Sequence, residues 1–361
     1  MTGLDGFRAE VRAFLAENVP SVRAAHRDEV AMRRDWDRRL HAAGLAGLSW
    51  PAEHGGRGLG ARAEFVYHEE AALAGAPEGY GRVGRLLTGP LLIRHGTAGQ
   101  VERFLPPILS GAEVWCQGFS EPEAGSDLAN VRTLAVRDGE EYRVTGQKTW
   151  TSFAQHADFC LLLARTCADA PRHRNLGMFL LDMRQPGVQV RPIRQISGAS
   201  RFCELFLTEA VVPCRNRVGA EGDGWRMALS VLTEERGPAD AITRYVSFAA
   251  LVGLLRECCA RAGGPELERL HIRVELIRWH ALRALEASAD GAEAREIASV
   301  FKLMWSHTWQ ELAGYGVSLS CPEHDDRWRT EYLDSRAGTI FSGTSEVQRN
   351  LVAERLLGLP R

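Results

Sequence analysis

The sequence predicts an α+β protein of three parts: an N-terminal helical domain over residues 1–112, a central β-barrel or sandwich over 113–217, and a C-terminal helical bundle over 218–361. The main observation is that the spacing of apolar residues changes twice, from a helical period to alternation and back. At 361 residues the chain is also long enough for two or three packed subdomains. We therefore expect helical, strand-rich and helical parts in that order.

The first part has helical periodicity. Apolar residues near the amino terminus recur on one helix face: Phe7, Val11, Phe14 and Leu15. Residues 34–45 and 61–75 continue in the same way. The glycine-rich stretch between them, 51–60, does not match the G-x-G-x-x-G pattern and follows no clear strand. We interpret it as a connecting loop and not as a phosphate-binding loop.

The second part contains short apolar or alternating runs, and turn signals separate them. These runs are 142–145, 159–164, 178–181, 188–190 and 205–207. Gly146 follows the first of these runs, Pro192 is expected to stop the fourth, and the fifth is expected to end near Pro213. Several short strands with turns between them indicate a small barrel or sandwich.

Helical spacing returns at about residue 223. The candidate helices are 225–235, 240–260, 265–289, 292–313 and 344–357. Pro265 follows two glycines and suits the first turn of a helix. Four or five long helices with short links predict a bundle.

The composition argues against several classes of function. A net charge of −2 gives no electrostatic reason to expect nucleic acid. The longest nearly apolar run, Val246 to Leu255, has about ten residues, whereas a membrane span needs about 20. The amino terminus lacks the apolar core of a secretory signal. The eight cysteines show no CxxC pair and no zinc spacing, so we expect reduced thiols, no metal site and a cytoplasmic protein.

Three motifs carry the chemistry of the chain. They are 116–127 (CQGFSEPEAGSD), 146–152 (GQKTWTS) and 340–350 (IFSGTSEVQRN). In this order, and on matching helical and strand segments, they resemble the acyl-CoA dehydrogenase family over essentially the whole chain. The resemblance implies FAD as cofactor and an acyl-CoA or acyl-carrier thioester as substrate. It also implies an electron-transferring flavoprotein or similar acceptor, and either a homo-oligomer (dimer or tetramer) or a hetero-oligomer with a homologue.

The first two motifs would form the isoalloxazine site. Such a ring has apolar faces and a polar edge, so its site needs an aromatic wall and a few hydrogen-bonding groups. By the resemblance, Phe119 and Ser120 lie along the ring edge, Trp150 flanks the ring, and Thr151 and Ser152 lie near its redox-active nitrogen. Composition alone would place both aromatic residues in a core, but the motif context favours the flavin.

The third motif would hold the other end of the cofactor. Thr344 and Glu346 match positions that hold the adenosine end of FAD, and Gly343 lets the backbone approach a ligand. A simple helix cap by Ser342 or Thr344 is the alternative, and it is compatible with ligand contact.

The first motif also contains a candidate substrate contact. By the resemblance, Ser126 matches a position that touches the thioester ligand.

The catalytic base is displaced from its usual place. Many family members carry a glutamate where this chain has Ser342, whose hydroxyl is a poor base but whose backbone N–H could polarise the thioester carbonyl. Some subfamilies place the glutamate on the first long helix of the bundle, immediately before an arginine. Glu235 and Arg236 match these positions, so we predict Glu235 as the base and assign Arg236 and Ser342 to substrate binding. Without the resemblance, this pair would be interpreted as a solvated helix face.

The residues on either side of this pair have other roles. On a helix, the side chain of Glu234 points about 100° away from that of Glu235. After Arg236, Gly237-Pro238 predicts a kink or restart of the helix.

One departure concerns the cofactor. Many members carry Arg-x-x-Phe-Gly after the second bundle helix, and that arginine reaches the FAD pyrophosphate of a neighbouring subunit. Residues 261–267 lack the Phe-Gly, so Arg269 and Arg273 become candidate substitutes. The glycine-rich turn before the last helices is also altered, at 313–317.

The leading hypothesis is FAD-dependent α,β-dehydrogenation of an acyl thioester with a branched or bulky acyl group, since a base on this helix often accompanies such groups in similar proteins. Two alternatives stay open. One is a non-catalytic subunit that completes the FAD site of a homologous chain. The other is a biosynthetic flavin oxidase or hydroxylase that acts on a carrier-bound group.

Overall fold

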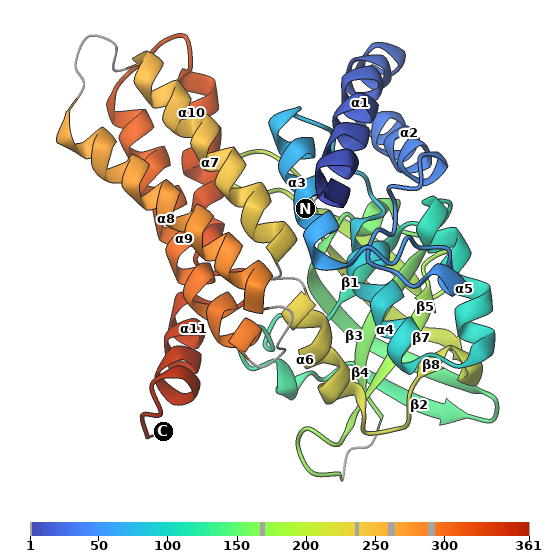
Figure 1. Cartoon of the computed structure of the whole chain (residues 1–361). Coiled ribbons are helices and arrows are strands. Elements are labelled where there is room, and N and C mark those ends of the chain that lie inside the picture. Colours follow the sequence, from blue (N-terminus) through green and yellow to red (C-terminus); the bar gives the residue numbers. More distant parts are fainter. Residues whose placement is uncertain (1, 167–169, 235–237, 259–263, 288–292, 361) are drawn as a thin grey trace. The chain divides into compact units, whose positions relative to one another are not determined.

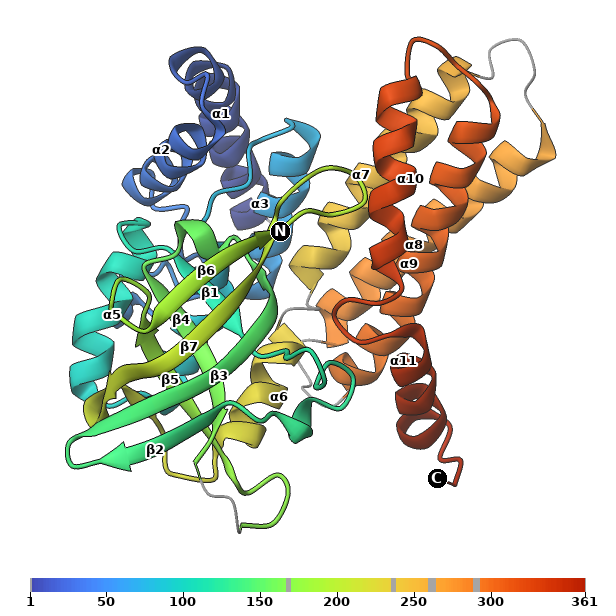
Figure 2. The same cartoon turned by 180° about the vertical axis from the view of Figure 1, so that it is seen from behind.

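The computed structural model describes residues 2–166, 170–234, 238–258, 264–287 and 293–360 (Figures 1 and 2). The chain forms two compact units. One contains Met1–Ala16, Leu59–Ala76 and Glu235–Arg361, and the other contains Glu17–Gly58 and Pro77–Glu234. The predicted order of helical, strand-rich and helical segments is confirmed.

Helices make up the first part of the chain. They are α1 (Thr2–Ala25), α2 (Glu29–Ala42), α3 (Gly60–Leu73), α4 (Gly89–His95) and α5 (Ala98–Ser110). Polar caps start two of them: Asp28 accepts the Ala31 N–H at 2.8 Å, and Thr97 and Gln100 form a capping box. The stretch 51–60 holds one 3-10 turn, Ala52–His54, in a connecting loop.

The central part is a mixed sheet. Its eight strands in the described ranges are β1 (Trp115–Gly118), β2 (Leu134–Asp138), β3 (Glu141–Ser152), β4 (Phe159–Arg165), β5 (Leu176–Asp182), β6 (Val188–Ile193), β7 (Phe202–Pro213) and β8 (Arg217–Val218). The strand order is β6-β7-β3-β2-β4-β5-β8, and β1 pairs with β4. The neighbours β6, β7, β3 and β2 can be followed in Figure 2. One residue pair, Leu134 with Arg165, joins the β6-β7-β3-β2 half to the β4-β5-β8 half.

The two halves of the sheet share one hydrophobic core. Tyr142 and Leu205 from one half cluster with Leu162 and Phe179 from the other, and the rings of Tyr142 and Phe179 are 5.0 Å apart. Alternate residues of the strands point into this core, as expected where two sheet layers pack face to face. The expected barrel-like or sandwich-like packing is thus present.

Helices return after β8. They are α6 (Gly224–Glu234), α7 (Pro238–Cys258), α8 (Pro265–Ala287), α9 (Glu293–Ser318), α10 (Asp325–Gly338) and α11 (Ser345–Leu351), and α11 continues as a π-helical turn over Val352–Leu356. The helices α7 to α10 pack around Leu251, Leu270, Phe301 and Trp328. Across the described part of the chain, no helix has the length and apolar character needed to cross a membrane.

The sequence analysis missed α10. This helix is strongly polar, and its buried residues are Trp328, Ser335 and Gly338, so it lacks the apolar stripe by which a helix is recognised. Trp328 fills the space beside Gly316 of α9, where a Cβ atom would lie 2.2 Å from its ring. A tryptophan packed on a glycine, together with hydrogen bonds from α9 to Glu331 and to the Ser335 carbonyl, therefore holds a helix that the apolar pattern does not reveal.

Candidate active site

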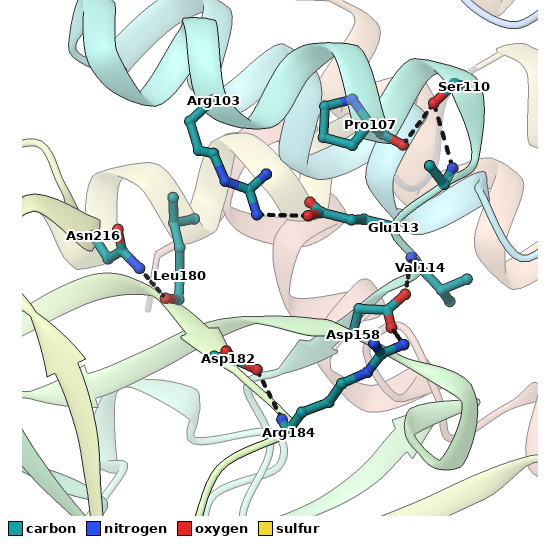
Figure 3. A network of polar contacts seen from close by, with 11 residues as sticks. Arg103, Pro107, Ser110, Glu113, Val114, Asp158, Leu180, Asp182, Arg184 and Asn216 are labelled. Atoms are coloured by element: carbon teal, nitrogen blue, oxygen red, sulfur yellow. Dashed lines mark hydrogen bonds and ion pairs between the residues drawn. The ribbon is translucent and has the colours of Figure 1, made fainter.

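A buried carboxylate fixes the start of β1, where the first motif begins. Asp158 is 5% exposed; its Oδ2 atom accepts the Val114 N–H at 2.8 Å, and its own N–H donates to the Val114 carbonyl at 2.7 Å. Arg184 pairs with the same carboxylate (Figure 3). These contacts hold the residue before β1, and β1 ends at Gly118, directly before Phe119 and Ser120 of the first motif.

A β-bulge in β3 turns Trp150 out of the sheet. Lys148 is paired with Leu205 and Thr151 with Cys203, so β3 has one residue more than β7 between these two pairs. Trp150 lies in this bulge, with a left-handed φ of 58°. Its side chain is 57% exposed, whereas Lys148 and Thr151 are fully buried. The bulge thus presents a flat aromatic side chain on a strand whose neighbouring residues point inward.

The two predicted aromatic residues differ in burial. The ring of Trp150 meets that of Phe202 edge-on, with centroids 6.0 Å apart, and most of the indole stays exposed. Phe119 is 4% exposed, so it would contact a ligand through its main-chain groups and not through its ring. Ser120 is half-buried, and its carbonyl accepts the Thr149 N–H at 2.9 Å. This bond joins the first motif directly to the second.

Thr151 has a buried hydroxyl without a hydrogen-bond partner in the described part of the chain. Leaving such a group unpaired costs about 1–3 kcal/mol, so native proteins seldom do it without a reason. Ser152 follows at half burial, at the end of β3. The exposed indole offers an apolar face for an isoalloxazine ring, and the next residue in sequence has a hydroxyl that no hydrogen bond of the described residues uses. The second motif therefore fits FAD.

A buried ion pair also connects the first two motifs. Lys148 Nζ lies 2.7 Å from Glu121 Oε1 and donates to the Phe119 carbonyl at 3.0 Å. Glu121 accepts the backbone N–H groups of Arg132 and Thr133 as well, at 2.6 and 2.9 Å. Burial would raise the pKa of the Glu121 carboxyl, but Lys148 and these N–H groups hold it below its usual value. Complete burial lowers the pKa of the Lys148 ammonium, and the attraction of Glu121 offsets part of this effect.

A tight turn exposes Ser126. The backbone groups of Glu121 and Ala124 bond to each other in both directions, at 3.1 and 3.2 Å. Gly125 and Ser126 follow this turn and are exposed. Ser126 is therefore placed where its hydroxyl can meet a ligand outside the sheet.

The third motif starts α11. Thr344 is the N-cap, and its hydroxyl accepts the Val347 N–H at 3.3 Å. The cap that the sequence offered as an alternative is present, at Thr344 and not at Ser342. Glu346 is exposed on the first turn, 3.6 Å from Arg349. Its pKa is lowered by hydrogen bonds from its own N–H and from Thr344.

Two consecutive left-handed residues precede this cap. Ser342 has a φ of 53° and Gly343 a φ of 89°. A Cβ atom on Gly343 would lie 2.4 Å from Gln348 Nε2, and the same amide donates to the Ser342 carbonyl at 3.3 Å. The turn thus needs glycine both for its dihedral angle and for the close approach of Gln348. It places no carboxylate at position 342.

The predicted base lies outside the described residues. Helix α6 ends at Glu234 and α7 begins at Pro238, so both Glu235 and Arg236 fall in the segment between them that is not described. The predicted kink or restart at Gly237-Pro238 falls at the edge of the same segment, so it stays a prediction.

The two arginines suggested for the FAD pyrophosphate both bind carboxylates on the bundle. Arg269 lies 2.5 Å from Glu266 and 3.0 Å from Glu311, and these neighbours raise its pKa. Arg273 lies 3.2 Å from the other oxygen of Glu311. A role at the pyrophosphate would have to compete with these ion pairs.

The Lys148–Glu121 pair is the part of the site that sequence reasoning did not find. Both residues lie in recognised motifs, but 27 positions separate them. A buried lysine has no local signature, because a charge in a strand normally indicates a solvent-facing side chain. Its neighbours Gln147 and Thr149 are themselves polar, so the local sequence did not single out Lys148 as a buried residue.

Models of three domains match nearly the whole chain. The acyl-CoA dehydrogenase N-terminal domain matches residues 4–112, the middle domain 116–210, and the C-terminal domain 222–357. The three matches follow the order in which the structure changes from helices to strands and back.

Named relatives agree with these matches. The acyl-CoA dehydrogenase IpdE1 of Mycobacterium tuberculosis is 40% identical over all of this chain and 99% of its own. Among solved structures, the Tcur3481-Tcur3483 steroid ACAD is 27% identical with a TM-score of 0.87, over 100% of this chain and 98% of that chain. The ChsE4-ChsE5 complex from Mycobacterium tuberculosis is 27% identical with a TM-score of 0.84, over 100% and 98%. The chain belongs to the acyl-CoA dehydrogenase family, and it is an FAD-dependent oxidoreductase that acts on CH–CH groups.

Proposed function

We propose that this chain catalyses α,β-dehydrogenation of a bulky acyl-CoA thioester, with Glu235 as the base. The supporting observation is the turn at Ser342 and Gly343. It keeps a strained backbone that leads into the cap at Thr344, yet it carries no carboxylate. An enzyme that removes an α-proton needs a base elsewhere, and Glu235 matches the alternative family position.

The residues of this chain divide the chemistry between them. Glu235 takes the α-proton of the thioester, and Arg236 beside it takes part in binding the acyl substrate. Ser342 contributes a backbone N–H that polarises the thioester carbonyl, which makes the α-proton more acidic. Ser126 holds the thioester ligand from its exposed turn.

FAD, when bound, supplies the acceptor for the β-hydride. Trp150 would lie against its ring, and Thr151, Ser152 and the main chain of Phe119 and Ser120 would provide hydrogen-bonding groups for it. Thr344 and Glu346 would hold the adenosine end. The exposed indole and the orphaned Thr151 hydroxyl support this assignment.

A polycyclic acyl group is the substrate class that the comparisons favour. One structural relative over the whole chain is described as a steroid ACAD. In similar proteins a base at the position of Glu235 often accompanies bulky acyl groups, and this agrees with a large ring system as substrate. Electrons then pass to an electron-transferring flavoprotein or a similar acceptor.

A second candidate function is that of a partner subunit in a hetero-oligomer. The relative ChsE4-ChsE5 is a complex of two differently named chains, and the Arg-x-x-Phe-Gly sequence is absent here. In this case the chain completes the FAD site of a homologue. The purified chain would then be colourless alone and yellow when it is co-expressed with that homologue.

The test is a spectrum of the purified protein followed by titration with acyl-CoA esters. Bleaching of the flavin band by a steroid-derived acyl-CoA, but not by a straight-chain ester of similar carbon number, is the expected result. Glu235→Gln should reduce the rate of bleaching by at least about 100-fold with FAD still bound. Glu234→Gln, one residue earlier, is the matched control and should bleach at nearly the normal rate. Full activity of Glu235→Gln would remove this residue from the mechanism.

A further inference from the structure

The sequence contains two lysines, and both side chains are buried. Of its 44 lysine and arginine residues, two are lysine, at positions 148 and 302. Lys148 is 0% exposed and Lys302 is 1% exposed. All the remaining residues in this count are arginine. Lysine is thus confined to two interior positions: Lys148 lies within the second motif, and Lys302 lies next to Phe341 of the third.

Lys148 holds the first motif against the second. Its ammonium bonds both to the Phe119 carbonyl and to the Glu121 carboxylate, and the Thr149 N–H bonds to the Ser120 carbonyl one residue along. An ammonium is compact and directs three donors, whereas a guanidinium is a broad planar group. The interior space below the bulge therefore suits lysine and not arginine.

Lys302 has the same relation to the third motif. It lies on α9 and donates to the carbonyl of Gly338, the last residue of α10. Its Nζ atom lies 4.7 Å from the ring centroid of Trp305 and 5.5 Å from that of Phe341. From Gly338 the chain runs through Phe341 to the cap at Thr344. Lys302 thus fixes the segment that leads into the third motif.

We propose that Lys148 and Lys302 are positioning residues for FAD, and that FAD binding is coupled to the burial of both amines. Each lysine holds one cofactor segment from the inside. A ligand that binds these segments only in their closed form lowers the population of open forms in which the amines reach water. This inference rests on the proposed assignment of the second and third motifs to FAD.

Amine labelling tests the coupling directly, because the chain has no other lysine. The holoprotein and the protein freed of FAD are treated with an amine-acetylating reagent, and each site is quantified by mass spectrometry. The α-amino group should react in both samples. Lys148 and Lys302 should stay unmodified in the holoprotein and react at least about tenfold faster without FAD. Equal rates in the two samples would overturn the proposal. So would a parallel rise at the buried thiol of Cys160, since that would indicate general opening.

Two variants separate positioning from simple stability. Lys148→Met should weaken FAD binding at least about tenfold and shift the flavin absorption band. The double variant Lys148→Met with Glu121→Gln removes both charges, so it should recover thermal stability but not the FAD affinity. Arg143→Met, on the same strand but 40% exposed, is the matched control and should bind FAD normally. Normal FAD affinity and an unchanged flavin spectrum in the double variant would contradict the proposal.

Failure of the proposed function is distinguishable from failure of this inference. FAD-dependent protection of the two amines in a protein that no acyl-CoA ester bleaches would refute the substrate assignment alone. Bleaching without any protection would refute the positioning role alone.

Discussion

The ammonium of Lys148 lies 2.7 Å from the carboxylate of Glu121, and the pair is buried where two sequence motifs meet. An unpaired charge at such a place would be strongly destabilising, so each residue requires the other. The pair connects β3, which carries Lys148, to the turn after β1, which carries Glu121.

The first prediction concerns acid stability. The pKa of Glu121 is lower in the folded protein than its ordinary value of 4.5. Its contribution to the free energy of unfolding is therefore complete above that value and is lost as the pH falls through the lower, folded-state pKa. Lys148→Met removes the main attractive charge and should move the midpoint of acid unfolding to higher pH. Circular dichroism against pH measures the midpoint, and Arg143→Met should leave it in place.

The second prediction concerns Trp150. Because its side chain is 57% exposed, Trp150→Ala should change the free energy of unfolding by no more than about 0.5 kcal/mol. The same change should weaken FAD binding about tenfold through loss of the aromatic wall. Fluorescence titration with FAD measures the affinity. Trp279→Ala, at 62% exposure on α8, is the control and should bind FAD normally. Unaltered affinity in Trp150→Ala would remove the indole from the flavin site.

The third prediction concerns Gly343. Alanine there meets both the left-handed φ of 89° and the Gln348 amide, so Gly343→Ala should lower the free energy of unfolding by more than about 1 kcal/mol. Chemical denaturation measures this loss. Gly314→Ala, in the interior of α9 with no atom within 4 Å of the added Cβ, should instead stabilise the protein by about 0.5–1 kcal/mol. If Gly343→Ala leaves the free energy of unfolding unchanged, the turn can adjust to a side chain at this position without cost.

The fourth prediction concerns the cap of α11. Thr344→Ala removes the acceptor for the Val347 N–H and should lower the free energy of unfolding by about 1 kcal/mol. If Thr344 also contacts adenosine, the FAD affinity of this variant should fall as well. Thr344→Ser keeps the hydroxyl and should retain both properties. A loss of stability with unchanged FAD affinity would leave Thr344 as a cap alone.

The sequence predicts most of the fold because the apolar period differs between helices and strands. Helix α10 is the exception, because it packs through one tryptophan against Gly316 and through polar contacts with α9, and not through a repeated apolar pattern. Hydrogen bonds join the first two motifs, but the sequence does not show how their residues are presented. The exposure of Trp150 depends on the register of β3 against β7, and the Lys148–Glu121 pair depends on contacts between segments distant in sequence.

The confinement of lysine to the interior has a chemical consequence for a protein that handles thioesters. A thioester transfers its acyl group to an unprotonated amine, so surface lysines of such a protein are exposed to slow damage by the substrate. Both lysines here lie in described segments and are buried, and arginine supplies the positive charge elsewhere. Guanidinium groups stay protonated at physiological pH and are poor nucleophiles. The folded chain can therefore remain in a pool of acyl-CoA without its lysine side chains becoming acylated.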